Sequence, residues 1–196
     1  HNINTVTINP AAVLFQLFSE MELAESNLER IIKVKGQLIE RDVLGILKDV
    51  SKGLIFAHER KIVHLDLKPD NILVKGGIFM ISDWGSALRV KNKELTVIKS
   101  QKAINPGYNA PELEEQNYEE KKQCNYFLCD VYSLGMIVIR MCGIEIKRII
   151  DVPKAEVKSH DDALNLLLDS IKESYSSKLL SLIRKMTMYD NMNRIS

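Results

Sequence analysis

The spacing of apolar residues changes several times along the chain, and each change predicts a different element. Residues 3–23 hold two apolar, β-branched runs separated by Asn-Pro-Ala-Ala, which is typical of two strands joined by a turn. Ser26 and Asn27 are good N-cap residues for a short helix that ends near Gly36. Between residues 41 and 60, apolar residues recur every three or four positions, which predicts an amphipathic helix. The residues expected on its packed face are Leu44, Leu47, Val50, Ser51, Leu54 and Ala57.

The middle of the chain switches to short β-type runs, and the last third returns to helical spacing. Residues 72–81 hold two such runs around Lys-Gly-Gly, which predicts a hairpin. Residues 86–109 are polar and Lys-rich without a clear period, so we expect a long loop. Residues 126–142 are apolar on all sides, which predicts a buried helix. Residues 162–175 and 177–189 predict two amphipathic helices.

Composition narrows the class of protein. A chain of 196 residues is the usual size of one domain, and its net charge of +1 favours neither nucleic acid nor a membrane surface as the main partner. The apolar runs are too short to cross a bilayer. Cys124, Cys129 and Cys142 form no even set, which predicts reduced thiols in an intracellular, cytoplasmic protein.

The stretch "HLDLKPDNIL", residues 64–73, concentrates residue types that carry catalysis. Asp66 could accept a proton from a hydroxyl group while Lys68 faces a transferring phosphate. A hairpin would bring Asn71 close to Asp83, and their oxygen atoms are ligands that Mg²⁺ prefers. The sequence therefore predicts a phosphoryl-transfer site on this turn.

These residues also resemble a known family, the eukaryotic protein kinases of the serine/threonine type. The matching motifs are His64-Leu65-Asp66 with Asn71, Asp83-Trp84-Gly85, Ala110-Pro111-Glu112, "DVYSLG" at 130–135, and Arg194. The resemblance implies that Arg194 pairs with Glu112 and that His64 has a scaffolding role. His58, on a helix, is expected to be a packed or capping residue.

The resemblance implies an α+β, protein-kinase-like fold. Its large lobe is mainly helical with a small β-hairpin site, and two N-terminal strands come from the small lobe. Residues 1–25 then hold the last small-lobe strands and the hinge, and residues 26–196 the helical large lobe. The start at His1 indicates a truncated record, in which upstream sequence supplies the rest of the small lobe.

The same resemblance implies an ATP- and Mg²⁺-dependent kinase that phosphorylates serine or threonine of protein substrates. The implied catalytic residues are Asp66, Lys68 and Asn71, and the implied metal ligands are Asn71 and Asp83. The implied cofactor-binding residues are Met21, Glu22, Ala24, Lys68, Leu73 and Asp83. Among them, Met21 is the expected gatekeeper, Glu22 and Ala24 offer hinge backbone groups to adenine, and Leu73 lies under its ring.

Three departures from the family pattern support an alternative. Leu65 replaces an Arg that pairs with a phosphorylated activation loop, so we expect independence from that switch. Asn105 replaces a Thr that bridges the catalytic Asp and Lys. The Gly-rich loop and the strand Lys are absent from the sequence. The alternative is a catalytically impaired, pseudokinase-like binding or scaffolding module. A small-molecule kinase fits less well, because Ala110-Pro111-Glu112 followed by "DVYSLG" is the protein-kinase arrangement.

Overall fold

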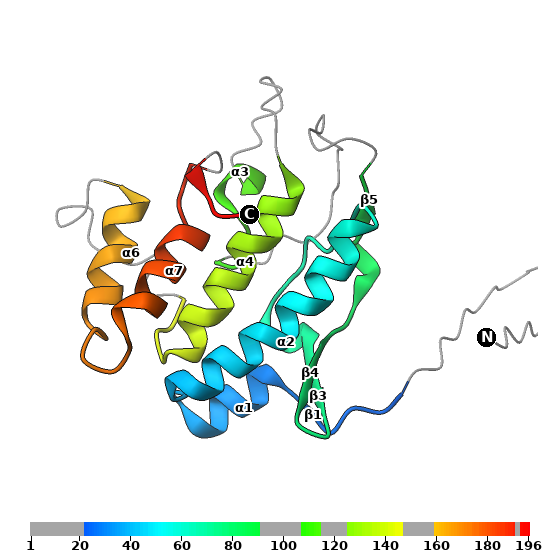
Figure 1. Ribbon diagram of the computed structural model, residues 1–196, viewed down its shortest axis with the longest axis horizontal. Coiled ribbons are helices and arrows are strands. Elements are labelled where there is room, and N and C mark those ends of the chain that lie inside the picture. Colours follow the sequence, from blue (N-terminus) through cyan, green and yellow to red (C-terminus); the bar gives the residue numbers. More distant parts are fainter. Residues whose placement is uncertain (1–21, 91–106, 115–124, 147–158, 191–192) are drawn as a thin grey trace, which may run out of the picture.

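The computed structural model describes residues 22–90, 107–114, 125–146, 159–190 and 193–196, and within them helices predominate (Figure 1). The elements, in chain order, are β1 (Ser26–Asn27), α1 (Leu28–Lys35), α2 (Glu40–Glu59), β2 (Ile62–Val63), η1 (Pro69–Asn71), β3 (Ile72–Lys75), β4 (Ile78–Ile81), η2 (Trp84–Ser86), β5 (Leu88–Arg89), α3 (Pro111–Glu114), α4 (Tyr126–Met141), α6 (His160–Asp169) and α7 (Ser177–Met186), where η denotes a short 3₁₀ helix. Nearly all of the two strands predicted at 3–23 lies outside the described residues.

Helix α1 begins and ends where its sequence signals predict. The side chain of Asn27 accepts a hydrogen bond from the backbone N–H of Arg30 at 2.9 Å, which satisfies one of the helix's first donors. Gly36 has φ +73° and donates its N–H to the carbonyl of Ile32 at 2.7 Å. A positive φ suits glycine, so the predicted stop is confirmed.

The long helix α2 is confirmed, but two residues of its predicted packed face are not buried: Ser51 is half-buried and Leu44 is exposed. Its buried residues are Val43, Ile46, Leu47, Val50, Leu54 and Ala57. Leu44 is 43% exposed. Successive helical residues are rotated by about 100°, so placing Val43 and Ile46 inward turns Leu44 outward.

Helix α4 is buried on nearly every side, as its apolar sequence predicts, and α6 and α7 lie on the side of it away from the strands (Figure 1). The contact with the end of α7 is close, because a Cβ atom at Gly135 would lie 2.5 Å from Cγ2 of Thr187. Helix α6 is shorter than the predicted 162–175 and ends at Asp169. There the Ser170 hydroxyl bonds the carbonyl of Leu167 at 2.6 Å, a side-chain contact that competes with continued helix.

The strands form two small antiparallel sheets, ordered β1-β3-β4 and β2-β5. The predicted hairpin is confirmed: Gly76 and Gly77, both with positive φ, connect β3 to β4. Strand β5 corrects the prediction of a continuous loop at 86–109, because Leu88 pairs with Val63. Local spacing does not reveal a strand of two residues that depends on a distant partner.

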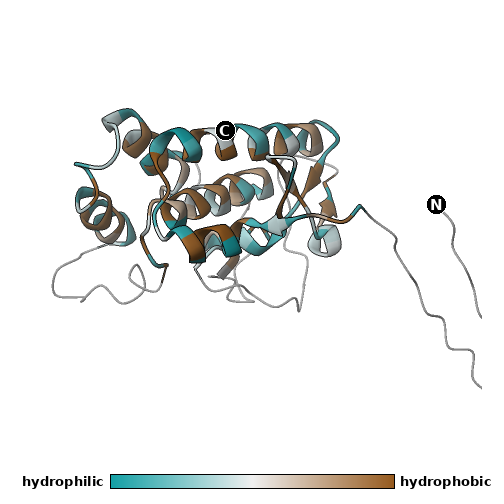
Figure 2. Ribbon diagram, turned by 90° about the horizontal axis from the view of Figure 1, so that it is seen from below, coloured by the Kyte–Doolittle hydropathy of each residue, from teal (hydrophilic) through white to brown (hydrophobic). Residues whose placement is uncertain are grey.

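The amphipathic helices carry both hydrophobic and hydrophilic residues along their length, and their hydrophobic sides meet in one core (Figure 2). β4 packs on α2 through Phe79 and Ile81, and Ile81 lies against Gly53. In the described part of the chain, every helix is too short or too polar to span a bilayer.

Candidate active site

The turn between β2 and β3 brings three predicted residues into contact. The Nζ atom of Lys68 lies 3.1 Å from Oδ2 of Asp66. The Nδ2 atom of Asn71 donates to the backbone carbonyl of Asp66 at 2.8 Å and to its carboxylate at 3.2 Å. Both side chains of the ion pair are partly exposed, at 24% for Lys68 and 16% for Asp66. The arrangement offers a carboxylate and an ammonium group at the surface of a fixed turn.

The turn is fixed from beneath by one buried carboxylate on α4. Asp130 has no solvent exposure and accepts hydrogen bonds from the backbone N–H groups of His64 and Leu65, each at 2.8 Å. His58, on α2, lies 2.9 Å from the same carboxylate through Nε2. Leu65 has φ +62°, a conformation that disfavours most L-residues. The two charge-assisted bonds offset that local strain.

His64 connects the turn to the hairpin, so its predicted scaffolding role is confirmed. Its Nδ1 accepts the backbone N–H of Asp66 at 3.2 Å, and its Nε2 lies 2.9 Å from the carbonyl of Ser82. Because a carbonyl only accepts, Nε2 carries the hydrogen. The imidazole also lies edge-on against Trp84, with ring centroids 4.8 Å apart. Its nitrogens are therefore occupied by structural contacts.

The hairpin brings the two predicted metal ligands to the same end of the sheet. Asn71 accepts the N–H of Ser82 at 2.8 Å through its backbone carbonyl, and Asp83 is the next residue. Asp83 is exposed with φ +56°, and its Oδ1 lies 3.4 Å from the N–H of Gly85. The Asn71 amide nitrogen is used on Asp66, so its oxygen is the atom that a cation would meet.

These two ligands fit a magnesium ion that keeps phosphate oxygens and waters in its shell, because both offer hard oxygen donors. A site built from three or more His, Cys, Asp or Glu side chains does not occur within the described ranges. The donor set therefore fits Mg²⁺ shared with a nucleotide better than a metal held by protein alone.

The predicted adenine-binding residues that the structure describes are spread along the hairpin: Leu73 lies near the middle of β3, and Glu22 and Ala24 lie toward the β3–β4 turn. Leu73 and Met80 are cross-strand partners, so their side chains share one face of the sheet. Glu22 and Ala24 precede β1, and the Glu22 carboxylate pairs with the ammonium group of Lys75 on β3. The chain is tied there a second time, because Glu25 accepts the N–H of Gly76 at 3.0 Å. Met21 lies outside the described residues, as does Asn105.

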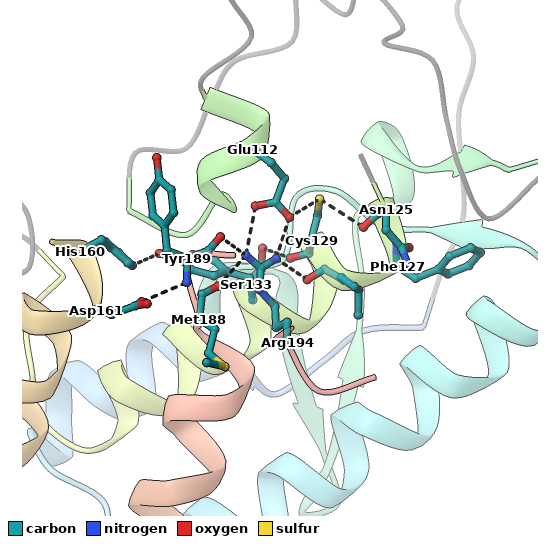
Figure 3. Close-up of polar contacts among 12 residues, drawn as sticks. Glu112, Asn125, Phe127, Cys129, Ser133, His160, Asp161, Met188, Tyr189 and Arg194 are labelled. Carbon is teal, nitrogen blue, oxygen red and sulfur yellow. Dashed lines mark hydrogen bonds and ion pairs between the residues drawn. The ribbon is translucent and has the colours of Figure 1, made fainter. Parts of the chain in front are cut away.

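The pairing expected between Arg194 and Glu112 is present and buried (Figure 3). The guanidinium donates to both carboxylate oxygens, from Nη1 at 2.7 Å and from Nη2 at 3.1 Å. It also donates to the carbonyls of Leu128, Met188 and Tyr189. The Glu112 carboxylate accepts a further weak bond from the thiol of Cys129 at 3.4 Å. This network fixes α3 against α4 and the C-terminal residues.

Sequence reasoning found the "DVYSLG" segment but missed that Asp130 supports the turn that carries the candidate catalytic residues. The available signal was a single carboxylate inside a helix that is mostly apolar, because such a group is rarely buried without partners. It also missed His160, whose Nε2 lies 3.0 Å from the hydroxyl of Tyr132 beside the Arg194 network (Figure 3). Burial lowers the pKa of His160 below its ordinary value.

Comparison with known proteins gives one consistent family. A sequence model described as the protein kinase domain matches residues 12–196. A Wee1-like protein kinase of Arabidopsis thaliana is 33% identical over 127 residues, covering 64% of this chain and 23% of that protein. The Wee1-like protein kinase of Oryza sativa subsp. japonica is 35% identical over 132 residues, with coverage of 64% and 22%.

A third relative, the serine/threonine-protein kinase PEPKR2 of Arabidopsis thaliana, is 32% identical over 126 residues. The match covers 63% of this chain and 24% of that protein. The chain thus spans about a quarter of the length of the curated relatives that it matches.

Proposed function

The chain belongs to the protein kinase family, and on that premise we propose that it transfers a phosphoryl group from ATP to serine or threonine hydroxyls of protein substrates. The observation that carries the proposal is the contact set on the turn. The side chains of Lys68 and Asn71 each lie within hydrogen-bond distance of the Asp66 carboxylate. A rigid turn matters because phosphoryl transfer depends mainly on positioning and electrostatic stabilisation.

Each side chain on the turn has a distinct role in this reaction. Asp66 orients the acceptor hydroxyl and accepts its proton, since its carboxylate is partly exposed and is held in place by Lys68 and Asn71. Lys68 stabilises the negative charge that develops on the transferring phosphoryl group. Asn71 and Asp83 would hold Mg²⁺, which supplies charge neutralisation at the phosphate oxygens. Bound substrate and nucleotide would cover these side chains and exclude water from them.

The nucleotide would lie along the hairpin face that carries Leu73. Leu73 supplies an apolar floor for adenine, and the backbone at Met21, Glu22 and Ala24 supplies its hydrogen-bonding groups. The contacts from Glu22 and Glu25 to the β3–β4 turn support this proposal, because they tie that backbone to the hairpin. Adenine and metal would then be held by one connected unit.

The decisive experiment is Asp66→Asn in the full-length gene product. We measure phosphate transfer from labelled ATP to a library of Ser- and Thr-centred peptides, together with thermal stabilisation by Mg·ATP. Loss of the proton acceptor should lower kcat by about 10²–10⁴-fold. Nucleotide stabilisation should persist, because Asp66 is not a proposed nucleotide ligand.

The matched control is Asp42→Asn, which neutralises a carboxylate on α2 that pairs only with surface residues Lys35 and Arg41 in the described structure. Its activity should equal that of the unmodified protein. An unmodified protein that neither binds Mg·ATP nor labels any peptide would favour the binding or scaffolding module instead. Full activity in Asp66→Asn would reject the assigned role of Asp66.

We also propose that the protein resides in the cytoplasm. Cys129 and Cys142 are buried, reduced thiols, as expected for a protein kept in a reducing compartment. A fluorescent fusion at the natural expression level tests the location. Accumulation in a secretory compartment would contradict it.

A further inference from the structure

Helix α2 lies between α4 and the β3–β4 hairpin and buries one face in the core (Figure 1). Its opposite face carries large apolar residues that remain in contact with solvent. Leu44 is 43%, Ile55 57% and Phe56 59% exposed. Single exposed apolar residues are common on protein surfaces, but three on one helix indicate a surface that another molecule can cover.

The charged residues on this exposed face are mostly basic. The exposed charged side chains of α2 and its C-cap are Arg41, Lys48, Lys52, Glu59 and Arg60. Four of these five are basic, whereas the whole chain has a net charge of only +1. Positive charge is therefore concentrated on this face, which favours a negatively charged partner.

Two of the basic residues, Lys48 and Lys52, are available to such a partner. Neither forms an ion pair within the described ranges of the chain. The neighbouring carboxylate of Asp49 is directed to the hairpin, where it accepts the N–H of Phe79 at 3.4 Å. The two ammonium groups are therefore not neutralised by the acidic residue that lies between them in the sequence.

The order of the residues around the helix distinguishes a peptide partner from a membrane surface. Successive helical residues are rotated by about 100°, so Lys48 and Lys52 lie along the middle of the exposed face. Leu44 and Ile55 lie on one side of them, and Phe56 lies on the other. A helix that binds in a membrane surface places apolar residues in the middle of its exposed face. Basic residues in the middle with apolar residues beside them fit the acidic and apolar side chains of a peptide.

The face also offers a flat, fixed surface to a bound chain. Gly45 is exposed in the interior of α2, and a Cβ atom there would meet nothing within 4 Å. Glycine weakens the interior of a helix, and no contact among the described residues requires it here, so the position suits close approach of another backbone. Arg60 lies 3.5 Å from the centroid of the Phe56 ring and donates to the Phe56 carbonyl at 3.0 Å, which fixes the aromatic side chain.

We propose that the exposed face of α2 docks an extended, acidic peptide segment of a partner protein. Ile55 follows Leu44 by three helical turns, about 16 Å. An extended chain rises about 3.3 Å per residue, so the segment carries two large apolar residues about five positions apart, with Asp or Glu between them. Its acidic residues meet Lys48 and Lys52, and its apolar residues meet the two ends of the face. This inference goes beyond the proposed kinase function and does not depend on it.

The test measures binding of fluorescein-labelled peptides to the full-length gene product by fluorescence polarisation, without nucleotide. The probes carry Leu and Phe about five residues apart with Glu at every position between them. A second set of probes has Lys in place of Glu. The Glu peptides should bind about tenfold more tightly than the Lys peptides, and added salt should weaken their binding.

The first variant combines Lys48→Glu with Lys52→Glu and reverses the charge in the middle of the face. Its affinity for the Glu peptides should fall about tenfold, because attraction at two positions becomes repulsion. The matched control combines Lys172→Glu with Lys178→Glu, two exposed lysines beyond α6 and on α7. It changes the net charge of the protein by the same amount and should bind the Glu peptides as the unmodified protein does.

The second variant, Gly45→Gln, separates loss of binding from damage to the fold. Gln favours a helix more than glycine does, so the melting temperature should rise. The added side chain occupies the space where the peptide backbone would lie, so affinity for the Glu peptides should fall about tenfold.

The remaining outcomes overturn the inference. Equal binding of Glu and Lys peptides does so, and so does unchanged affinity in both variants. Vesicles of phosphatidylcholine with and without phosphatidylserine provide the alternative ligand. Binding to the phosphatidylserine vesicles but to no peptide, lost in the first variant, would assign this face to a membrane surface instead. Binding to neither would show that the face docks no acidic ligand.

Discussion

The two sides of the candidate catalytic turn, residues 64–71, differ in how completely their polar groups are hydrogen-bonded. On the side of α4, His64 and Asp130 have no solvent exposure, and in the described residues every buried side-chain nitrogen or oxygen has a hydrogen-bond partner. On the other side, the hairpin face that carries Leu73 leaves Ile78 59% and Met80 40% exposed. Asp83 is also exposed. The turn is thus buried and hydrogen-bonded on the side of α4 and exposed to solvent on the side of the hairpin face.

The difference has a physical cause in the cost of burying charged groups. A buried charge without partners is costly, so the contacts beneath the turn form as a complete set and define its geometry. An apolar face at the surface costs less and suits the flat ring of a nucleotide. Helices α2 and α4 therefore contribute the contacts beneath the turn, and the exposed face is where we propose that the nucleotide lies.

The largest effect is expected for Arg194→Met, in the buried network that fixes α3 against α4. It removes a buried guanidinium and leaves the Glu112 carboxylate, which is 11% exposed, without its cation. We expect the free energy of unfolding to fall by about 3–5 kcal/mol, the usual effect of breaking one partner of a buried ion pair. Urea denaturation measures it.

The control for this prediction is Arg184→Met. Arg184 makes a comparable 2.8 Å pair with Asp169, but the two side chains are 36% and 62% exposed. We expect a loss of at most about 1 kcal/mol because solvent screens the pair. Equal losses in the two variants would contradict the contrast between buried and exposed pairs.

Asp130→Asn should have the next largest effect. The amide keeps the shape of the carboxylate but loses the charge that accepts two backbone N–H groups, from His64 and Leu65. We expect a loss of about 2–3 kcal/mol in unfolding free energy, since hydrogen bonds to charged groups contribute more than neutral ones. Rapid hydrogen exchange at these two amides would accompany it. Slow exchange there in the variant would show that other contacts fix the turn.

Ile78→Thr should have the smallest effect and tests the open side. The substitution keeps a β-branched residue in β4 and shortens an exposed side chain. We expect a change within about 0.5 kcal/mol, as is usual for surface positions. A loss above about 1.5 kcal/mol in urea denaturation would mean that this face is covered in solution. The hairpin face would then not differ in burial from the α4 side of the turn.

Much of the local structure follows from short-range signals in the sequence. The N-cap Asn27, the stop at Gly36 and the glycine pair at 76–77 each act through neighbouring backbone groups, so their effects are visible in a few residues. The apolar repeat of α2 was sufficient to predict the helix. The wrong placement of Leu44 on the packed face shows that the exact buried face depends on what packs against the helix.

The site divides in the same way. The sequence by itself determined the candidate residues Asp66, Lys68 and Asn71, because their types and spacing within one turn are local properties. Only the tertiary structure decided that Asp130, more than sixty residues away, supports this turn, and that Arg140 on α4 meets Glu29 on α1. The physical reason is that a buried carboxylate or guanidinium is stabilised by whatever partners the packed helices bring to it, and spacing along the chain does not specify those partners.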